Sequence, residues 1–169
     1  MNNKKFDIFI DCGASKIRAC AFNKKNSKKY FYTESKFFFD HSNIQSDIQE
    51  IISLLEKDTN EYLNDINLMI DSSKILPISI SISKKLDGSK LKKDDIQFLI
   101  QDAKQQILRN YPKYNIVHII IKKYKIDNID YPLLPSEINC NKLSIDIIFI
   151  CLPKQEIENL KKIFSKFDI

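Results

Sequence analysis

Hydrophobic and polar residues alternate along several stretches of this chain, and a period of two predicts half-buried β-strands. Near the N-terminus, apolar runs at 6–10 and 17–22 flank a short turn and predict a pair of strands. An aromatic-rich stretch at 30–39 predicts a third strand, after a polar, lysine-rich connection at 23–29. Further along, isoleucines alternate with serines over 75–83, which predicts a strand with one buried face.

Apolar residues spaced three and four apart predict amphipathic helices in three other stretches. Ser42 or Asn43 can cap the first helix, which runs to about Lys57. The second helix occupies about 94–110, and the third occupies 153–166, with a proline at its first position, where a missing N–H costs nothing. We expect the third helix to pack on the second sheet; a membrane-surface helix is the alternative.

The remaining apolar runs complete the predicted order of elements. A short strand is expected at 66–70, and another at 116–121 that extends into 124–126 after a bend. A proline-containing loop at 131–141 then leads to a long apolar strand at 143–152. The order is β-β-β-α-β, followed by β-α-β-β-α.

This order predicts an α/β protein with two domains. A three-strand meander, a crossover helix and a further strand form the opening half of an RNase H-like sheet. We place the boundary in the polar turn at 71–74, which gives one domain at 1–73 and a small α+β domain at 74–169.

The charge of the chain does not favour nucleic acid as a partner. The net charge is +5, but among the 27 basic residues only Arg18 and Arg109 are arginines, which supply the forked contacts that read bases and phosphates. No apolar run reaches the ~18 residues of a membrane span. The N-terminus has no apolar signal segment, so a soluble, cytoplasmic protein without a direct membrane segment is expected.

Cysteines and histidines do not predict a metal site or a catalytic group. The four cysteines include no Cys-x-x-Cys pair, so neither zinc nor redox chemistry is indicated. The two histidines, His41 and His118, are expected in a turn and in a strand, away from any cluster with ligand spacing. No catalytic triad can be assembled, and Asp94 and Asp95 are interpreted as first-turn helix carboxylates.

The turn between the first two strands carries the strongest candidate chemistry. It contains Gly13, one of only two glycines in the chain, and a glycine here permits a positive φ. Successive N–H groups in such a turn form a concavity that suits a phosphate. Asp11 beside it is suited to orient a hydrated Mg²⁺. The alternative is a plain hairpin turn with a solvated carboxylate.

This turn and several later stretches together resemble FtsA, a family of bacterial cell-division proteins with an actin-like fold. In that family the first strand and turn read Asp-Ile-Gly-Thr-Ser-Lys, and residues 11–16 here read Asp-Cys-Gly-Ala-Ser-Lys. The stretch at 66–72 lies where the family has the strand before an inserted subdomain, and 93–96 resembles the start of that subdomain's helix. The stretches at 117–120 and 124–127 resemble the strand that follows.

The resemblance implies a partial actin-like subdomain 1A over 1–73 and an SHS2 (strand–helix–strand–strand) subdomain over 74–169. The family's second half, with the second phosphate loop, the adenosine pocket, the FtsZ-binding surface and the membrane helix, has no counterpart in these residues. We therefore expect only one wall of a nucleotide site. ATP and Mg²⁺ are expected to bind weakly or not at all, without enzymatic activity of this chain alone.

The resemblance also assigns roles at the turn. Asp11 would orient Mg²⁺, and the backbone of Gly13, Ala14, Ser15 and Lys16 would face the β and γ phosphates. Side-chain contacts are implied for the serine and the lysine. Ala14 stands where the family has a threonine, so the hydroxyl group of that position is missing.

The function implied is that of a structural interaction module at the division septum, on the inner face of the membrane. Its expected partners are cell-division proteins and, through the SHS2 subdomain, a second copy of itself, with the contact surface around 84–130. One alternative is half of an actin-fold ATPase or kinase that another chain completes. Another is a pilus-assembly protein of similar fold.

Overall fold

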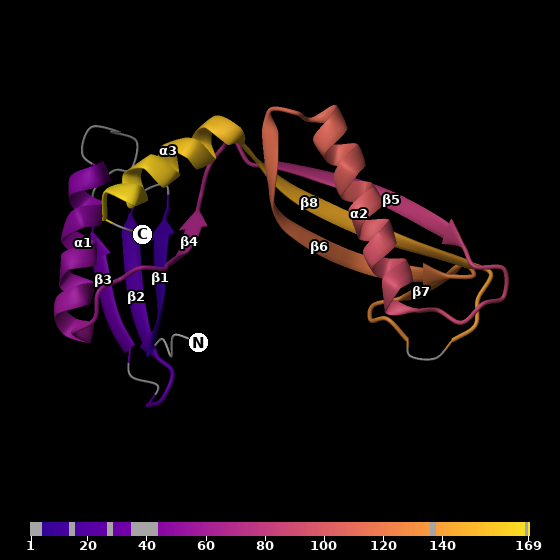
Figure 1. Ribbon diagram of the computed structural model, residues 1–169, viewed down its shortest axis with the longest axis horizontal. Coiled ribbons are helices and arrows are strands. Elements are labelled where there is room, and N and C mark those ends of the chain that lie inside the picture. The colour runs from indigo at the N-terminus through magenta and orange to yellow at the C-terminus, as the bar shows by residue number, and fades with distance from the viewer. Residues whose placement is uncertain (1–4, 14–15, 27–28, 35–43, 136–137, 168) are drawn as a thin grey trace. The chain divides into compact units, whose positions relative to one another are not determined.

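The protein is a mixed α/β structure, in which the described residues form two four-stranded sheets and three α-helices (Figure 1). The computed structural model describes the chain except residues 1–4, 14–15, 27–28, 35–43, 136–137 and 168, and at 31–34 and 44 it describes the backbone only. The chain forms two compact units, Met1–Ser73 with Glu158–Ile169, and Lys74–Ile157.

The first unit is a four-stranded sheet with a helix between its third and fourth strands. Its elements are β1 (Phe6–Cys12), β2 (Ile17–Asn23), β3 (Lys29–Glu34), α1 (Ile44–Thr59), β4 (Asn67–Ile70), the C-terminal part of α3 (Lys154–Phe164) and the 3-10 turn η1 (Ser165–Phe167). The strand order is β3-β2-β1-β4, with β4 parallel to β1 and the other pairs antiparallel. A parallel neighbour requires a crossover connection, and α1 supplies it.

One hydrophobic core fills the first unit. Alternate residues of β1 and β2 are buried, as the period of a strand with one covered face requires. The apolar stripe predicted for α1 is confirmed, since its buried members are Ile48, Ile51, Ile52 and Leu55. A further contribution comes from the C-terminal end of the chain, where Phe164 is buried in the same core.

The second unit is an antiparallel sheet with one helix on one of its faces (Figure 1). Its elements are β5 (Leu76–Lys85), α2 (Lys93–Asn110), β6 (Tyr114–Ile126), β7 (Ile129–Tyr131) and β8 (Lys142–Pro153). The strand order is β5-β8-β6-β7, so the last strand in sequence lies between the first and the second. Alternate residues of β8 from Leu143 to Cys151 are buried in a core shared with α2, and the residues between them lie on the other face.

Most of the predicted elements are present, and the differences have local causes. β6 is one strand, interrupted by register shifts between Ile116 and His118 and between Ile121 and Lys123, where a bend was expected. No strand was predicted between 126 and the loop at 131–141, where β7 is found; it is short and lies at the edge of the sheet. Pro153, expected at the first position of the third helix, is instead the last residue of β8.

The expected packing of the third helix on the second sheet is wrong for its C-terminal half. Phe164 is buried in the core of the first unit, and Ile163 and Phe167 pack against that core. The division between the units accordingly falls within α3, after Ile157, whereas the sequence assigned everything to residue 169 to the second domain. The proposed caps at 42–43 and the aromatic residues at 35–39 lie outside the described residues.

Within the part of the chain that the structure describes, none of the helices is both long and apolar enough to span a membrane.

Candidate functional site

The turn between β1 and β2 is the site predicted from the sequence, and strand register determines where its residues lie. The two strands pair in antiparallel register as far as Cys12 opposite Ile17. The hairpin therefore brings Asp11, at the end of β1, to the same edge of the sheet as Gly13 and Lys16. These are the described members of the predicted set.

Glycine suits position 13 because the backbone leaves little room for a side chain there. Its N–H donates a 3.0 Å hydrogen bond to the carbonyl oxygen of Lys16, and a Cβ at Gly13 would lie 3.2 Å from the same oxygen. The positive φ that a glycine permits is not used at Gly13; of the two glycines only Gly88 has one, at 82°. The Gly13 N–H is thus engaged within the turn, and Ala14 and Ser15 lie outside the described residues.

Asp11 is paired with an arginine that the sequence analysis did not include in the site. Arg18 lies directly opposite it on β2, and its Nη1 donates to Asp11 Oδ2 at 2.8 Å. The Asp11 side chain is 26% exposed and that of Arg18 is 58% exposed, so water screens this pair and its contribution to stability is small. Hairpin register is the signal that identifies Arg18, since a turn after Cys12 and before Ile17 makes positions 11 and 18 partners.

Cys12 is adjacent to this carboxylate but faces the core. Burial raises the pKa of the Cys12 thiol to about 12, and the charge of Asp11 adds to the effect. The thiolate is the reactive form of cysteine, so Cys12 is unreactive at neutral pH. It contributes apolar contacts to the core, as expected from the sequence.

A second carboxylate belongs to the same edge of the sheet. β1 and β4 are parallel neighbours with Cys12 opposite Ile70, and the N–H of Asp71 donates to the carbonyl oxygen of Cys12 at 3.1 Å. Asp71 therefore follows β4 next to the end of β1, where Asp11 is the second-last residue. The carboxyl ends of neighbouring parallel strands meet at one edge, and this rule identifies Asp71 once β4 is placed next to β1.

Two carboxylates, Asp11 and Asp71, and the hairpin turn are the groups that meet at this edge. Among the described residues, no group of three or more His, Cys, Asp or Glu side chains is arranged to hold a metal ion. Two carboxylates can bind Mg²⁺ only together with water and phosphate oxygens, which is its usual mode of binding. Arg18 already donates to Oδ2 of Asp11 and would compete with a cation there.

The remaining predicted positions are dispersed. His118 lies exposed on β6, as expected for a strand residue, and His41 lies outside the described residues. Asp94 and Asp95 lie in the first turn of α2, where Asp95 accepts hydrogen bonds from the Lys92 backbone and the Lys84 ammonium group. These carboxylates stabilise a helix and do not form a catalytic pair.

No protein-family model matches this chain, and no curated protein matches it.

Proposed function

We propose that this chain is a non-enzymatic interaction module similar to the N-terminal half of FtsA, with a structural role at the bacterial division site. One observation carries the proposal. A β3-β2-β1-β4 sheet, with β4 parallel to β1 after a crossover helix, is followed directly by a unit in which β5, α2, β6 and β8 form a strand–helix–strand–strand order, with the three-residue edge strand β7 between β6 and β8. This is the order in which an actin-like subdomain 1A would precede an SHS2 subdomain.

The second unit supports the proposal at the residues that carry the resemblance. Val117 to Ile120 and Tyr124 to Ile126 lie along β6, and Asp127 opens the turn after it. Lys93 begins α2, as the start of the inserted helix should. The strand β8 lies between β5 and β6 and completes a three-stranded core sheet, to which β7 adds a short edge.

Exposed apolar side chains in the region 84–130 support a binding role for the second unit. Phe98 and Leu108 are exposed on α2, and Val117 and Ile120 are exposed on β6. These four side chains are apolar groups available on two faces of the unit for contact with a partner protein. Division proteins and a second copy of this chain are the proposed partners.

Imaging of a fluorescent fusion at native expression tests this role. We expect a band at the division site. Phe98→Ser and Ile120→Ser each alter one exposed face of the second unit, and the variant that loses the band identifies the contact face. Tyr62→Ser is the matched control, because Tyr62 is 92% exposed in the first unit. Fluorescence that coincides with pilus machinery, or that fills the cell evenly, would contradict the proposal.

A second candidate function, half of an actin-fold ATP site, is favoured by the placement of Asp11 and Asp71. Both carboxylates belong to one edge of the first sheet, next to the hairpin turn. In this role Asp11 would orient the Mg²⁺ of ATP, and another chain would supply the second wall. Competition from Arg18 predicts weak binding by the chain alone.

Calorimetric titration of the chain with ATP and Mg²⁺ tests this second candidate. Asp11→Ala should abolish the heat of binding, whereas Asp7→Ala should leave it unchanged. Asp7 is a suitable control because it lies on the same strand and also forms an exposed ion pair, with Lys24 at 2.8 Å. Binding that survives Asp11→Ala would rule out the role given to Asp11.

A further inference from the structure

One face of the second sheet carries two contrasting surfaces. Residues opposite one another in antiparallel strands share a face, so the register defines what lies on the side away from α2. Towards one end of the sheet, Ile148 on β8 lies beside Ser79 and Ile120. Towards the other end, Ser144 lies between Ser83 of β5 and Lys125 of β6, and the surface is polar.

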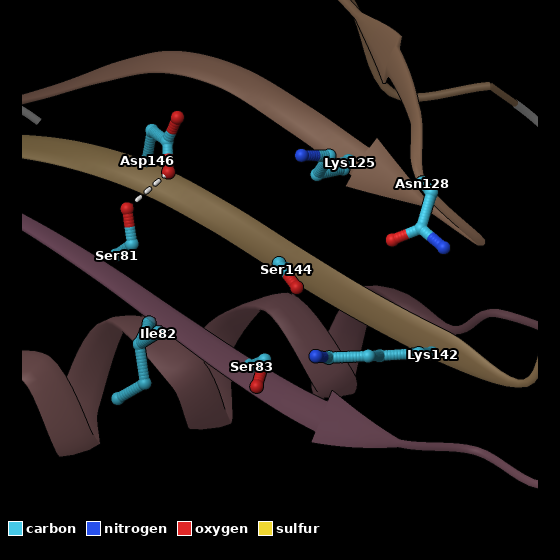
Figure 2. A pocket seen from close by; sticks show the side chains of 8 residues that line it. All are labelled: Ser81, Ile82, Ser83, Lys125, Asn128, Lys142, Ser144 and Asp146. Carbon is cyan, nitrogen blue, oxygen red and sulfur yellow. Dashed lines mark hydrogen bonds between the residues drawn. The ribbon is translucent and has the colours of Figure 1, made fainter.

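A shallow pocket occupies this polar end (Figure 2). Its lining residues are Ser81, Ile82, Ser83, Lys125, Asn128, Lys142, Ser144 and Asp146. Figure 2 shows the side chains of Lys125 and Lys142 on either side of Ser144. Two ammonium groups, several hydroxyl groups and one amide therefore surround a single depression.

The carboxylates on this face are already held by other groups. Lys123 Nζ lies 2.6 Å from Asp130 Oδ2 and 3.7 Å from Asp146 Oδ2, and Asp146 also accepts a hydrogen bond from the Ser81 hydroxyl group. Because of the contact with Lys123, the pKa of Asp130 lies below its usual value and that of Lys123 lies above. Lys123 balances one of these two negative charges, and Lys125 and Lys142 bring two further positive charges to the same face, which leaves it net positive.

The lysines of the pocket are less closely paired, although Lys125 lies opposite Asp130 on β7 and its charge also lowers the pKa of that carboxyl. Neither Lys125 nor Lys142 forms an ion pair among the described residues. Lys142 also lies directly opposite Lys85 on β5. Lys85 likewise forms no ion pair in the described part of the chain. Like charges opposite one another destabilise a sheet. Repulsion between Lys85 and Lys142 therefore destabilises this end of the sheet, and a bound anion would reduce that repulsion.

The backbone beside the pocket is held in place before any ligand arrives. Asp127 and Asn128 form the turn between β6 and β7 with φ values of 46° and 73°, a conformation that Asp and Asn tolerate better than most residues. The Asp127 carboxylate accepts the N–H of Asn141 at 3.0 Å and that of Lys142 at 2.8 Å. This network fixes both Asn128 and the backbone that carries Lys142.

We propose that this pocket binds the phosphoryl group of a phosphorylated serine or threonine in an extended segment of a partner protein. A phosphate monoester has three strong acceptor oxygens and a charge of about −1.5 to −2, which match two ammonium groups with neighbouring hydroxyl and amide donors. A carboxylate has fewer acceptors and a smaller charge. The proposal does not depend on the assignment to cell division.

The extended form of the ligand follows from the position of the pocket. Ser81 and Ser83 belong to β5, which is the edge strand of the sheet, and no described strand pairs with its outer side. An unpaired edge can accept a peptide as an additional strand, with side chains directed towards adjoining pockets. Binding sites for small metabolites are more enclosed than this open face.

NMR titration of the isotopically labelled chain tests the proposal. The probes are a blocked peptide of alternating valine and threonine with one central phosphoserine, the same peptide with serine, and inorganic phosphate, at equal ionic strength. We expect the phosphopeptide to shift the amide signals of Ser83, Lys142 and Ser144 at concentrations at which the other two probes do not. Lys125→Gln with Lys142→Gln should weaken binding about tenfold or more.

The matched control is Lys104→Gln with Lys113→Gln, which removes the same charge from α2 and from the residue that precedes β6, and should bind as the unchanged chain does. Dispersed spectra for both double variants establish that they fold. Equal affinity for inorganic phosphate and phosphopeptide would overturn the proposal. Unchanged binding in the Lys125/Lys142 variant, or no shift at these amides, would overturn it as well.

Discussion

At the end of β1, Cys12 is a buried side chain that directly follows a partly exposed one. Its thiol belongs to the core, whereas the preceding residue, Asp11, reaches solvent. Burial, and then the charge of Asp11, raise the pKa of Cys12 to about 12. A thiol with this pKa is ionised only to about one part in ten thousand at pH 8.

Cys12 is therefore expected to resist thiol labelling in the folded protein. Mass-spectrometric mapping after brief alkylation at pH 8 should find Cys12 unmodified until denaturant is added. Cys20 is the internal control, because it lies on the neighbouring strand and is partly exposed, although burial raises its pKa too. Rapid native labelling of Cys12 would show that β1 is not buried as described.

At the scale of single residues, sequence reasoning located the turn but not the partners of its side chains. Asp11, Gly13 and Lys16 do lie together. The ion pair with Arg18 depends on which residues face each other across the hairpin, and the neighbouring Asp71 depends on β4 lying parallel to β1. Both facts require pairing information that hydrophobic periodicity does not contain.

At the scale of elements, α2 begins with a carboxylate that has two roles. Asp95 accepts the N–H of Lys92 at 2.9 Å and the ammonium group of Lys84 at 2.7 Å. The hydrogen bond from Lys84 is the main reason that the pKa of Asp95 is lowered. A group whose pKa is lower in the folded state stabilises the protein above its unfolded pKa, and this contribution is lost as pH falls through the folded pKa.

Replacement of Asp95 by asparagine should thus lower the free energy of unfolding by about 1 kcal/mol at pH 7. The difference from the unchanged chain should shrink in acid, where Asp95 itself becomes protonated. Urea unfolding at both pH values measures this. Asp94→Asn is the control, since Asp94 is exposed in the same turn. An equal loss from both variants would mean that Asp95 acts only through the helix dipole.

Elements with a strong period were predicted well, and those that depend on tertiary contacts were not. The buried stripes of α1 and α2 follow directly from spacings of three and four residues. The strand β7 was missed because a three-residue edge strand has too few positions to show a period. Pro153 favoured a helix start, but pairing with Tyr114 keeps it in β8.

At the scale of the molecule, the chain enters the second unit after Ser73 and leaves it within α3. The two units have separate hydrophobic cores. The sequence could not assign the end of α3 to either core, because an amphipathic helix shows that one face is buried but not what covers it. The structure assigns Phe164 to the first core.

Phe164→Ala should accordingly destabilise the first unit by about 3 kcal/mol, the usual cost of removing a buried phenyl ring. Hydrogen exchange should accelerate at the amides of β1, β2 and α1 and remain slow in β8. Phe98→Ala is the control, because Phe98 is 57% exposed. Faster exchange in β8, with β1 unaffected, would place the end of α3 on the other core.

The central claim, an interaction module similar to the first half of FtsA, is tested most directly by affinity capture with mass spectrometry at native expression. We predict that the chain recovers cell-division proteins. The same substitution that abolishes the band at the division site, Phe98→Ser or Ile120→Ser, should reduce the amounts recovered. Recovery of pilus-assembly components in place of division proteins would contradict the claim.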